Sequence, residues 1–267
     1  MKKLLAVMLA SMMFLAAAGC KGNAPGGVSS SPASSGAESS SGAPAASSAG
    51  QQTASSAAPK GALAVPKANY QIKWTSYLFA KGSKNFKVKY PQISGSASDA
   101  AVNALLKQAA MKTVNAIGTG NTSSFAEVTT VCHVTYNKAD FLSAEFEETS
   151  RTSKTAAETK AYRTVNYDLK NSKELALGDL VQQNSALTSA VKTAVQKHVS
   201  SQKKAQITDA VIASGVKTCN VCYKPSGFVI GLPVPASAGG YALLTMNYPE
   251  TSGFRTNNAV WSYFVKT

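Results

Sequence analysis

The segment from Lys21 to Lys60 limits what this chain can fold into more than any other feature of its sequence. It consists mostly of Ser, Ala, Gly and Pro and contains no aromatic residue. Such a composition cannot bury enough apolar surface to offset the entropy lost on ordering, so we expect a disordered linker. We extend this tether over residues 20–68, which leaves about 200 residues to form a folded part with a substantial core.

The first 19 residues have the pattern of an export signal. Lys2 and Lys3 are followed by an apolar run that is too short to span a bilayer comfortably, and small residues then lead to Cys20. This arrangement resembles a bacterial lipoprotein signal peptide, in which the cysteine is lipidated and becomes the first residue of the mature protein. An ordinary secretory signal with an incidental cysteine is the alternative. We expect an extracytoplasmic, membrane-anchored lipoprotein of a bacterial envelope.

The part of the chain after the linker is basic. All but four of the 27 Lys and Arg residues, and all but one of the 13 Asp and Glu residues, lie in residues 61–267, which gives this part a formal net charge of +11. Such an excess favours anionic partners, such as wall or lipid phosphates, acidic glycans or a membrane surface. It is also compatible with a charge that serves solubility alone. We expect no nucleic-acid partner and no cofactor.

Three cysteines lie beyond Cys20, at Cys132, Cys219 and Cys222. Exported domains experience oxidising conditions, so a disulfide between Cys219 and Cys222, or between Cys132 and either of them, is expected. Proximity in sequence favours the short link between Cys219 and Cys222, which would stabilise the fold by about 2 kcal/mol through loop entropy. A long link from Cys132 would contribute about 4.6 kcal/mol by the same effect. A redox motif or a zinc site is less well supported, because Cys132 and His133 point to opposite faces of a predicted strand. We therefore expect no metal.

Two histidines and two glutamates are the candidates for a catalytic role. His133 and His198 have no accompanying catalytic motif, and we interpret His198 as a partly buried helix residue. Glu145 and Glu147 share one face of a predicted strand and lie about 7 Å apart, a separation that inverting glycosidases use. Alternating acids are also typical of any solvent-facing strand, and we prefer this interpretation. A wall hydrolase that uses these two residues is therefore the last of our hypotheses, and we expect no enzyme.

The stretch 162–181 contains three acidic residues and could be taken for an active site. Asp168, Glu174 and Asp179 fall on a strand face, in a turn and near the start of a helix. Because these positions need not converge, we interpret the stretch as scaffold.

Hydrophobic periodicity predicts strands and two main helices in the folded part. Apolar residues alternate with polar ones in the predicted strands and recur every three or four positions in the predicted helices. A glycine at position 118 is expected to end the first helix, and Ser98 is a plausible N-cap. The predicted strands are residues 70–80, 85–90, 125–136, 140–149 and 161–169, and the predicted helices are 98–117 and 188–202.

Several short motifs resemble RsiV/PdaC-type extracytoplasmic domains, a family of paired modules whose general function is unknown. The motifs lie mainly at turn and core positions of those modules. They are Tyr90–Gly95, Asn103 in the following helix, Val134–Asn137, Phe141–Glu147, Val165–Leu180, Gly227–Pro235 and Leu243–Glu250.

The resemblance covers residues 70–250 approximately and implies a fold but no active site. The implied fold is α+β, with antiparallel β-sheet(s) and two main packed helices, preceded by the signal peptide and the disordered linker. We expect an N-terminal α+β module at residues 69–182 and a C-terminal helix-plus-strands module at residues 183–267, packed as one unit.

The predicted lipid anchor, the positive net charge and the family resemblance together predict a lipid-anchored, non-enzymatic binding module of the cell envelope. We expect it to engage an anionic or glycan wall component such as peptidoglycan. The candidate ligand-binding residues are Lys81, Lys84, Lys87 and Lys89. In the predicted strand, Lys87 and Lys89 share one face, and the three apolar side chains of residues 86–90 lie on the other. Lysines that protect an edge strand against aggregation are the alternative. A sensor or inhibitor that binds a secreted wall hydrolase, or another envelope protein, is the second hypothesis.

Overall fold

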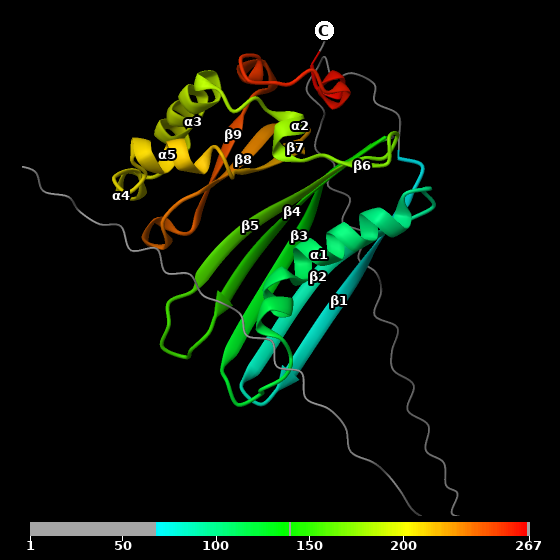
Figure 1. Cartoon of the computed structure of the whole chain (residues 1–267), viewed down its shortest axis with the longest axis vertical. Helices are drawn as coiled ribbons and strands as arrows, with labels where there is room; N and C mark the ends of the chain where they lie inside the picture. Colours follow the sequence, from blue (N-terminus) through cyan, green and yellow to red (C-terminus); the bar gives the residue numbers. More distant parts are fainter. Residues whose placement is uncertain (1–67, 139, 266–267) are drawn as a thin grey trace, which may run out of the picture. The chain divides into compact units, whose positions relative to one another are not determined.

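The computed structural model describes residues 68–138 and 140–265 (Figure 1). The predicted signal peptide, Cys20 and almost all of the predicted tether lie outside the described residues. The described part contains one six-stranded mixed sheet, one three-stranded antiparallel sheet and a few helices, which confirms the predicted α+β class. Within it, no helix has both the length and the apolar character needed to cross a membrane.

The elements follow one another in the order strands, helix, strands, helices, strands. The nine strands are Gln71–Lys81 (β1), Lys84–Ser94 (β2), Ala126–Lys138 (β3), Phe141–Arg151 (β4), Thr159–Asp168 (β5), Lys173–Glu174 (β6), Asn220–Lys224 (β7), Gly227–Pro233 (β8) and Tyr241–Met246 (β9). The helices are Asp99–Ile117 (α1), Leu177–Leu180 (α2), Ser185–His198 (α3), Ser201–Lys204 (α4) and Asp209–Gly215 (α5), with 3-10 turns at Ala236–Ala238 (η1), Tyr248–Thr251 (η2) and Ala259–Tyr263 (η3).

The large sheet is mixed rather than purely antiparallel. Its strands lie in the order β1-β2-β3-β4-β5-β6, and every neighbouring pair is antiparallel except β2 and β3. Two consecutive parallel strands require a crossover connection, and α1 supplies it. The sheet therefore differs from the antiparallel expectation at the one pair that the helix connects.

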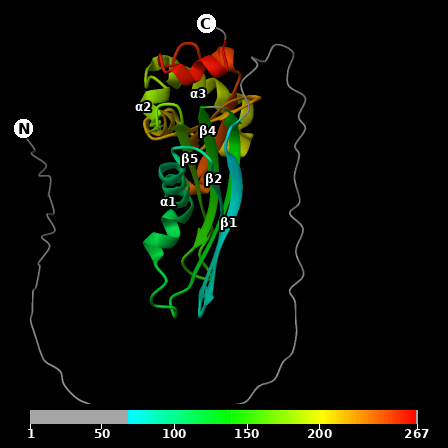
Figure 2. The same ribbon diagram turned by 90° about the vertical axis from the view of Figure 1, so that its right-hand side faces the viewer.

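Helix α1 covers one face of the large sheet (Figure 2). The side chains beneath it alternate along β2 with exposed residues, as the sequence pattern predicted. At the start of α1, Asp99 accepts hydrogen bonds from the backbone N–H groups of Gly95 and Ser96, whereas the predicted N-cap Ser98 makes no side-chain cap. Gly118 ends the helix at φ 70°, a conformation that glycine adopts without strain.

A buried ion pair fastens α1 to the sheet. Arg163 on β5 makes two hydrogen bonds of 2.9 and 3.0 Å to the carboxylate of Glu148 on β4. Both residues also bond to the hydroxyl of Thr113 on the helix. The Glu148 side chain is 2% exposed, so its charge depends on these partners for stabilisation.

The small sheet, in the order β7-β8-β9, packs with one face on β3, β4 and β5, on the side of the large sheet opposite α1. Two side-chain amides connect the sheets: Asn166 donates to the carbonyl of Val221 at 2.8 Å, and Asn220 donates to that of Tyr162 at 3.0 Å. Gly231 makes the close approach possible, because a Cβ there would lie 2.1 Å from a Tyr162 ring carbon. Helices α3 and α5 contact strands of the same small sheet.

Candidate functional site

The large sheet has an uncovered surface on the side opposite α1. The small sheet occupies this side over β4, β5 and the end of β3, whereas β1, β2 and the first part of β3 are exposed to solvent. Register and burial define this surface, which we call the open face. Its side chains are Trp74, Ser76, Leu78 and Ala80 from β1, Asn85, Lys87 and Lys89 from β2, Glu127, Thr129, Val131 and His133 from β3, and Thr149 and Arg151 from β4.

Apolar and basic side chains lie next to one another on the open face. Leu78 is 74% exposed, Trp74 47% and Val131 45%, and these are three of the four exposed large hydrophobic residues in the described part of the chain. Leu78 pairs in register with Lys87, and the Lys89 ammonium lies 5.3 Å from the centre of the Trp74 ring, a cation–π arrangement.

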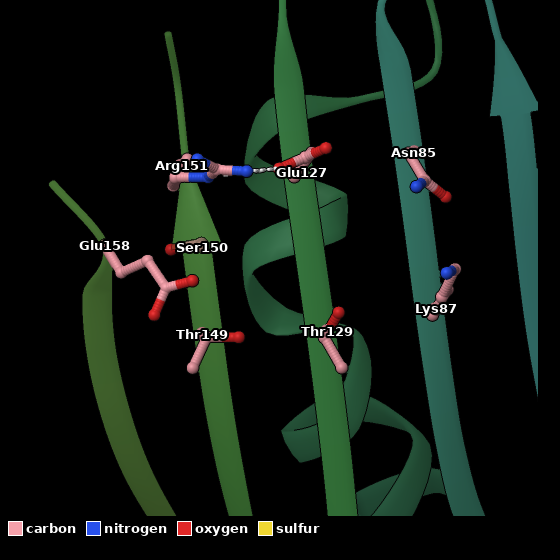
Figure 3. A pocket seen from close by; sticks show the side chains of 8 residues that line it. All are labelled: Asn85, Lys87, Glu127, Thr129, Thr149, Ser150, Arg151 and Glu158. Atoms are coloured by element: carbon pink, nitrogen blue, oxygen red, sulfur yellow. Dashed lines mark hydrogen bonds and ion pairs between the residues drawn. The ribbon is translucent and has the colours of Figure 1, made fainter. Parts of the chain in front are cut away.

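A shallow hollow of about 220 Å³ lies on the open face near the end of the sheet that carries the β1–β2 turn (Figure 3). Two rows of residues cross it in register, Lys87–Thr129–Thr149 and Asn85–Glu127–Arg151. We call it the polar hollow. Its lining residues are Asn85, Lys87, Glu127, Thr129, Thr149, Ser150, Arg151 and Glu158.

The charges around the polar hollow are unevenly distributed. Arg151 forms an ion pair with Glu127 across β4 and β3, with an Nε–Oε2 distance of 3.1 Å, so these two charges balance. Lys87 and Lys89 have no ion-pair partner among the described residues. Glu158 lies across two strands from Lys87 (Figure 3). The β2 side of the hollow is therefore positive. No group of three metal-ligating side chains lies together in the described part of the chain.

Two of the four predicted ligand lysines belong to this surface. Lys87 and Lys89 project from the open face, as the alternation predicted. Lys84 does not: it is 4% exposed on the α1 side, and its ammonium donates to the carbonyl of Gly118 at 2.7 Å. Lys81 is exposed at the end of β1, in register with Lys84. The alternative of an edge strand protected by lysines is wrong for β2, which lies between β1 and β3.

Glu145 and Glu147 do share one face of β4, but the prediction that this face is solvated is wrong. Glu145 is 4% exposed, accepts a 2.8 Å hydrogen bond from the Tyr162 hydroxyl and forms a 2.8 Å ion pair with Lys224. Glu147 accepts a 2.7 Å bond from the Tyr241 hydroxyl. Burial and the bond to Glu147 raise the pKa of Tyr241 above its ordinary value, so the hydroxyl remains a donor. Both carboxylates hold the small sheet in place.

All three described cysteines are free, buried thiols, which differs from the disulfide prediction. Cys132 lies in the core beneath α1, and Cys219 contacts the carbonyl of Val216. Cys222 lies 3.3 Å from the Tyr162 hydroxyl. Cys219 directly precedes β7 and Cys222 lies within it, and no bond joins the two thiols. Burial raises the pKa of each of these two thiols to about 12, which keeps them neutral.

The remaining candidates do not assemble into a catalytic group. His133 is exposed on the open face, and His198 is exposed in the last turn of α3 rather than partly buried as predicted. Asp168 caps the turn after β5 and Asp179 caps α2, whereas Glu174 is exposed on β6. These three acids therefore do not converge on one point, as predicted for a stretch that serves as structural scaffold.

The comparisons with known proteins identify a shared fold. No protein-family model matches the chain, and no curated protein matches it significantly. Among solved structures, a DUF3298 family protein from Pseudomonas aeruginosa PAO1 is similar at 14% identity, with 72% of this chain and 96% of that chain covered and a TM-score of 0.46. A DUF3298 family member from Bacteroides fragilis NCTC 9343 is similar at 12% identity, over 75% of this chain and 100% of that chain, with a TM-score of 0.51.

This chain shares the fold of the Bacteroides DUF3298 protein. DUF3298 denotes a domain of unknown function, so the likeness supports the architecture and names no activity. The short motifs of the sequence likewise predict a domain family of unknown general function.

Proposed function

We propose that this chain is a lipid-anchored, non-enzymatic binding module of a bacterial cell envelope, of the RsiV/PdaC type. It engages an anionic or glycan component of the wall through its open face. The observation that carries this proposal is that Lys87 and Lys89 project together from an uncovered sheet surface, beside the exposed Trp74.

The chemistry of the open face fits such a component. An ammonium group binds phosphate or carboxylate by charge-assisted hydrogen bonds, and the net charge of the folded part draws anionic polymers toward it. The flat indole of Trp74 offers an apolar surface with a polar edge, against which the C–H face of a sugar ring can lie. Cys20, if lipidated, would hold the module at a membrane surface.

A binding role is also supported by the positions of the two glutamates that a hydrolase would need. Glu145 is buried in an ion pair with Lys224, and Glu147 is bonded to Tyr241. Their contacts serve the junction between the two sheets.

Sedimentation with isolated peptidoglycan sacculi tests the proposal. A chain from Lys21 to Thr267 is mixed with sacculi, with or without their anionic polymers, over a range of salt concentrations. We expect binding that requires the polymers and weakens with salt. Replacing Lys87 and Lys89 with Gln should weaken binding and flatten its salt dependence.

The matched control removes the same charge from the other side of the sheet. Lys107 and Lys112 are exposed on α1, and their replacement with Gln should leave sedimentation close to that of the unchanged chain. Equal losses in both double variants would show that net charge alone matters. Absence of sedimentation with either preparation of sacculi would refute wall binding.

The edge of β1 favours a second candidate, a sensor or inhibitor of a wall hydrolase. β1 is eleven residues long, and among the described residues no strand pairs with its outer edge. An extended segment of a protein partner can add a strand to such an edge, with Trp74 and Leu78 beside it. This candidate requires salt-tolerant, stoichiometric capture of one secreted hydrolase, lost in Trp74→Ser/Leu78→Ser. Recovery of polysaccharide alone would count against it.

A further inference from the structure

We propose that the polar hollow is a saccharide subsite for a sugar unit that carries a carboxylate or phosphate. In this arrangement the anionic group lies on the β2 side against Lys87, and the sugar hydroxyls lie over β3 and β4. The inference rests on the proposed function and deepens it, because it assigns the glycan class and the residues that distinguish a sugar from another anion.

The side chains of the hollow match the hydrogen-bonding needs of sugar hydroxyls. A hydroxyl both donates and accepts, and the amide of Asn85 and the hydroxyls of Thr129 and Thr149 also offer both functions. The Glu127–Arg151 pair adds carboxylate acceptors and guanidinium donors, and its two hydrogen bonds both go to Oε2 of Glu127. The volume of about 220 Å³ has room for one sugar ring.

The register of the strands sets the length of the ligand. Lys87, Thr129 and Thr149 lie directly beside one another on β2, β3 and β4. Neighbouring strands are about 4.8 Å apart, so this row spans about 10 Å, which is roughly the length of a sugar ring with one acidic substituent. Side chains on paired strands are held more precisely than side chains on loops, which favours a preformed site.

The charge distribution sets the direction of the ligand. Lys87 has no acidic partner among the described residues, whereas Arg151 is balanced by Glu127. At the opposite rim Glu158 repels an anion, although Lys160, in register with Thr149, offsets that charge. An acidic substituent is therefore most favourable at the β2 side. A polyanion without hydroxyls can accept hydrogen bonds from the lysines and threonines but offers no donor to the acceptor groups of the hollow, such as the Glu127 carboxylate.

Binding of three soluble probes to the chain from Lys21 to Thr267 tests the inference. The probes are an oligomer of a hexuronic acid, an oligomer of a sugar phosphate and a linear polyphosphate of equal charge. Comparison of the affinities for the first two probes shows whether the site prefers a carboxylate or a phosphate on the sugar. We expect at least one saccharide to bind about tenfold more tightly than polyphosphate. Thr129→Val/Thr149→Val, which keeps side-chain shape and removes two hydroxyls that can both donate to and accept from a sugar, should abolish most of that preference and weaken polyphosphate binding much less.

Two further variants keep the test decisive. Thr149→Phe, which fills the hollow with a residue that strands accept, should weaken saccharide binding in the same way. Thr245→Val, on the exposed side of β9, is the matched control and should change nothing. Circular dichroism and melting temperature verify that each variant is folded.

The outcomes separate this inference from the proposed function. If polyphosphate binds as tightly as both saccharides, or if the threonine variants bind saccharide normally, the subsite is refuted while lysine-dependent wall binding stands. If neither the probes nor sacculi bind, the proposed function is refuted as well.

Discussion

Gly231 determines how closely the two sheets can approach each other. A Cβ at this position would overlap the Tyr162 ring, which lies between the sheets. We predict that Gly231→Ala lowers the free energy of unfolding by about 1–3 kcal/mol, because the ring has to move within a packed interface. Urea unfolding measures the change. Gly178→Ala is the control: a Cβ there meets no atom within 4 Å, and its effect should be small. Equal effects of the two substitutions would contradict the close approach.

Single residues also show which parts of the site a sequence can reveal. The alternation in residues 86–90 correctly placed Lys87 and Lys89 on a shared exposed face. The same period assigns Lys84 to the opposite, buried face, so the sequence contained the information that excludes it from the strip. Trp74 and Leu78 were missed, because β1 carries apolar residues on both faces and its pattern does not say which face is covered.

At the scale of the elements, the buried pair between Glu148 and Arg163 connects β4 and β5 to α1. We predict that Glu148→Leu alone lowers the free energy of unfolding by about 3–5 kcal/mol, because it leaves the Arg163 charge without its partner. Glu148→Leu/Arg163→Met should recover part of this loss, since no buried charge remains. A double-mutant cycle in urea measures the coupling.

The surface pair Lys192–Asp209 is the control for this cycle. The side chains of these residues are 45% and 80% exposed, so breaking the pair should cost less than about 1 kcal/mol. A loss at Glu148 no larger than this would show that the buried pair contributes little.

The strands and the two longer helices could be predicted from periodicity, but their pairing could not. The parallel contact of β2 and β3 depends on α1 crossing the sheet between them, which joins residues about 40 positions apart, such as Phe86 and Val128. Likewise, the burial of Glu145 depends on Lys224, which lies on another sheet. A local pattern cannot encode a contact of this range, so Glu145 had the appearance of a solvated residue.

At the scale of the whole molecule, the two sheets share one apolar cluster. Tyr136 and Phe141, from β3 and β4, pack with Tyr223 and Phe228, from the small sheet, and with Trp261 near the C-terminus. The predicted boundary between residues 182 and 183 therefore lies within a continuous core. The open face exists because the small sheet covers β4, β5 and the end of β3 and leaves β1, β2 and the first part of β3 uncovered, an arrangement that no single segment of sequence specifies.

We predict that the described part of the chain unfolds in one cooperative transition. In the variant Trp74→Phe, the buried Trp261 becomes the sole tryptophan and reports on the C-terminal region, while far-UV circular dichroism reports on both sheets. Because the cluster is shared, the two signals should have coincident midpoints in urea. Separate midpoints would show that residues 69–182 and 183–267 are independent modules.

The eleven-residue ladder between β1 and β2 has a mechanical consequence if the chain is anchored through its N-terminus. An anchor pulls on the start of β1, whereas a wall ligand on the open face holds β2, β3 and β4. The hydrogen bonds of an antiparallel ladder lie perpendicular to the strands. Tension along β1 therefore loads these bonds together in shear instead of opening them one at a time from an end. We expect the sheet to transmit force between membrane and wall without losing its edge strand.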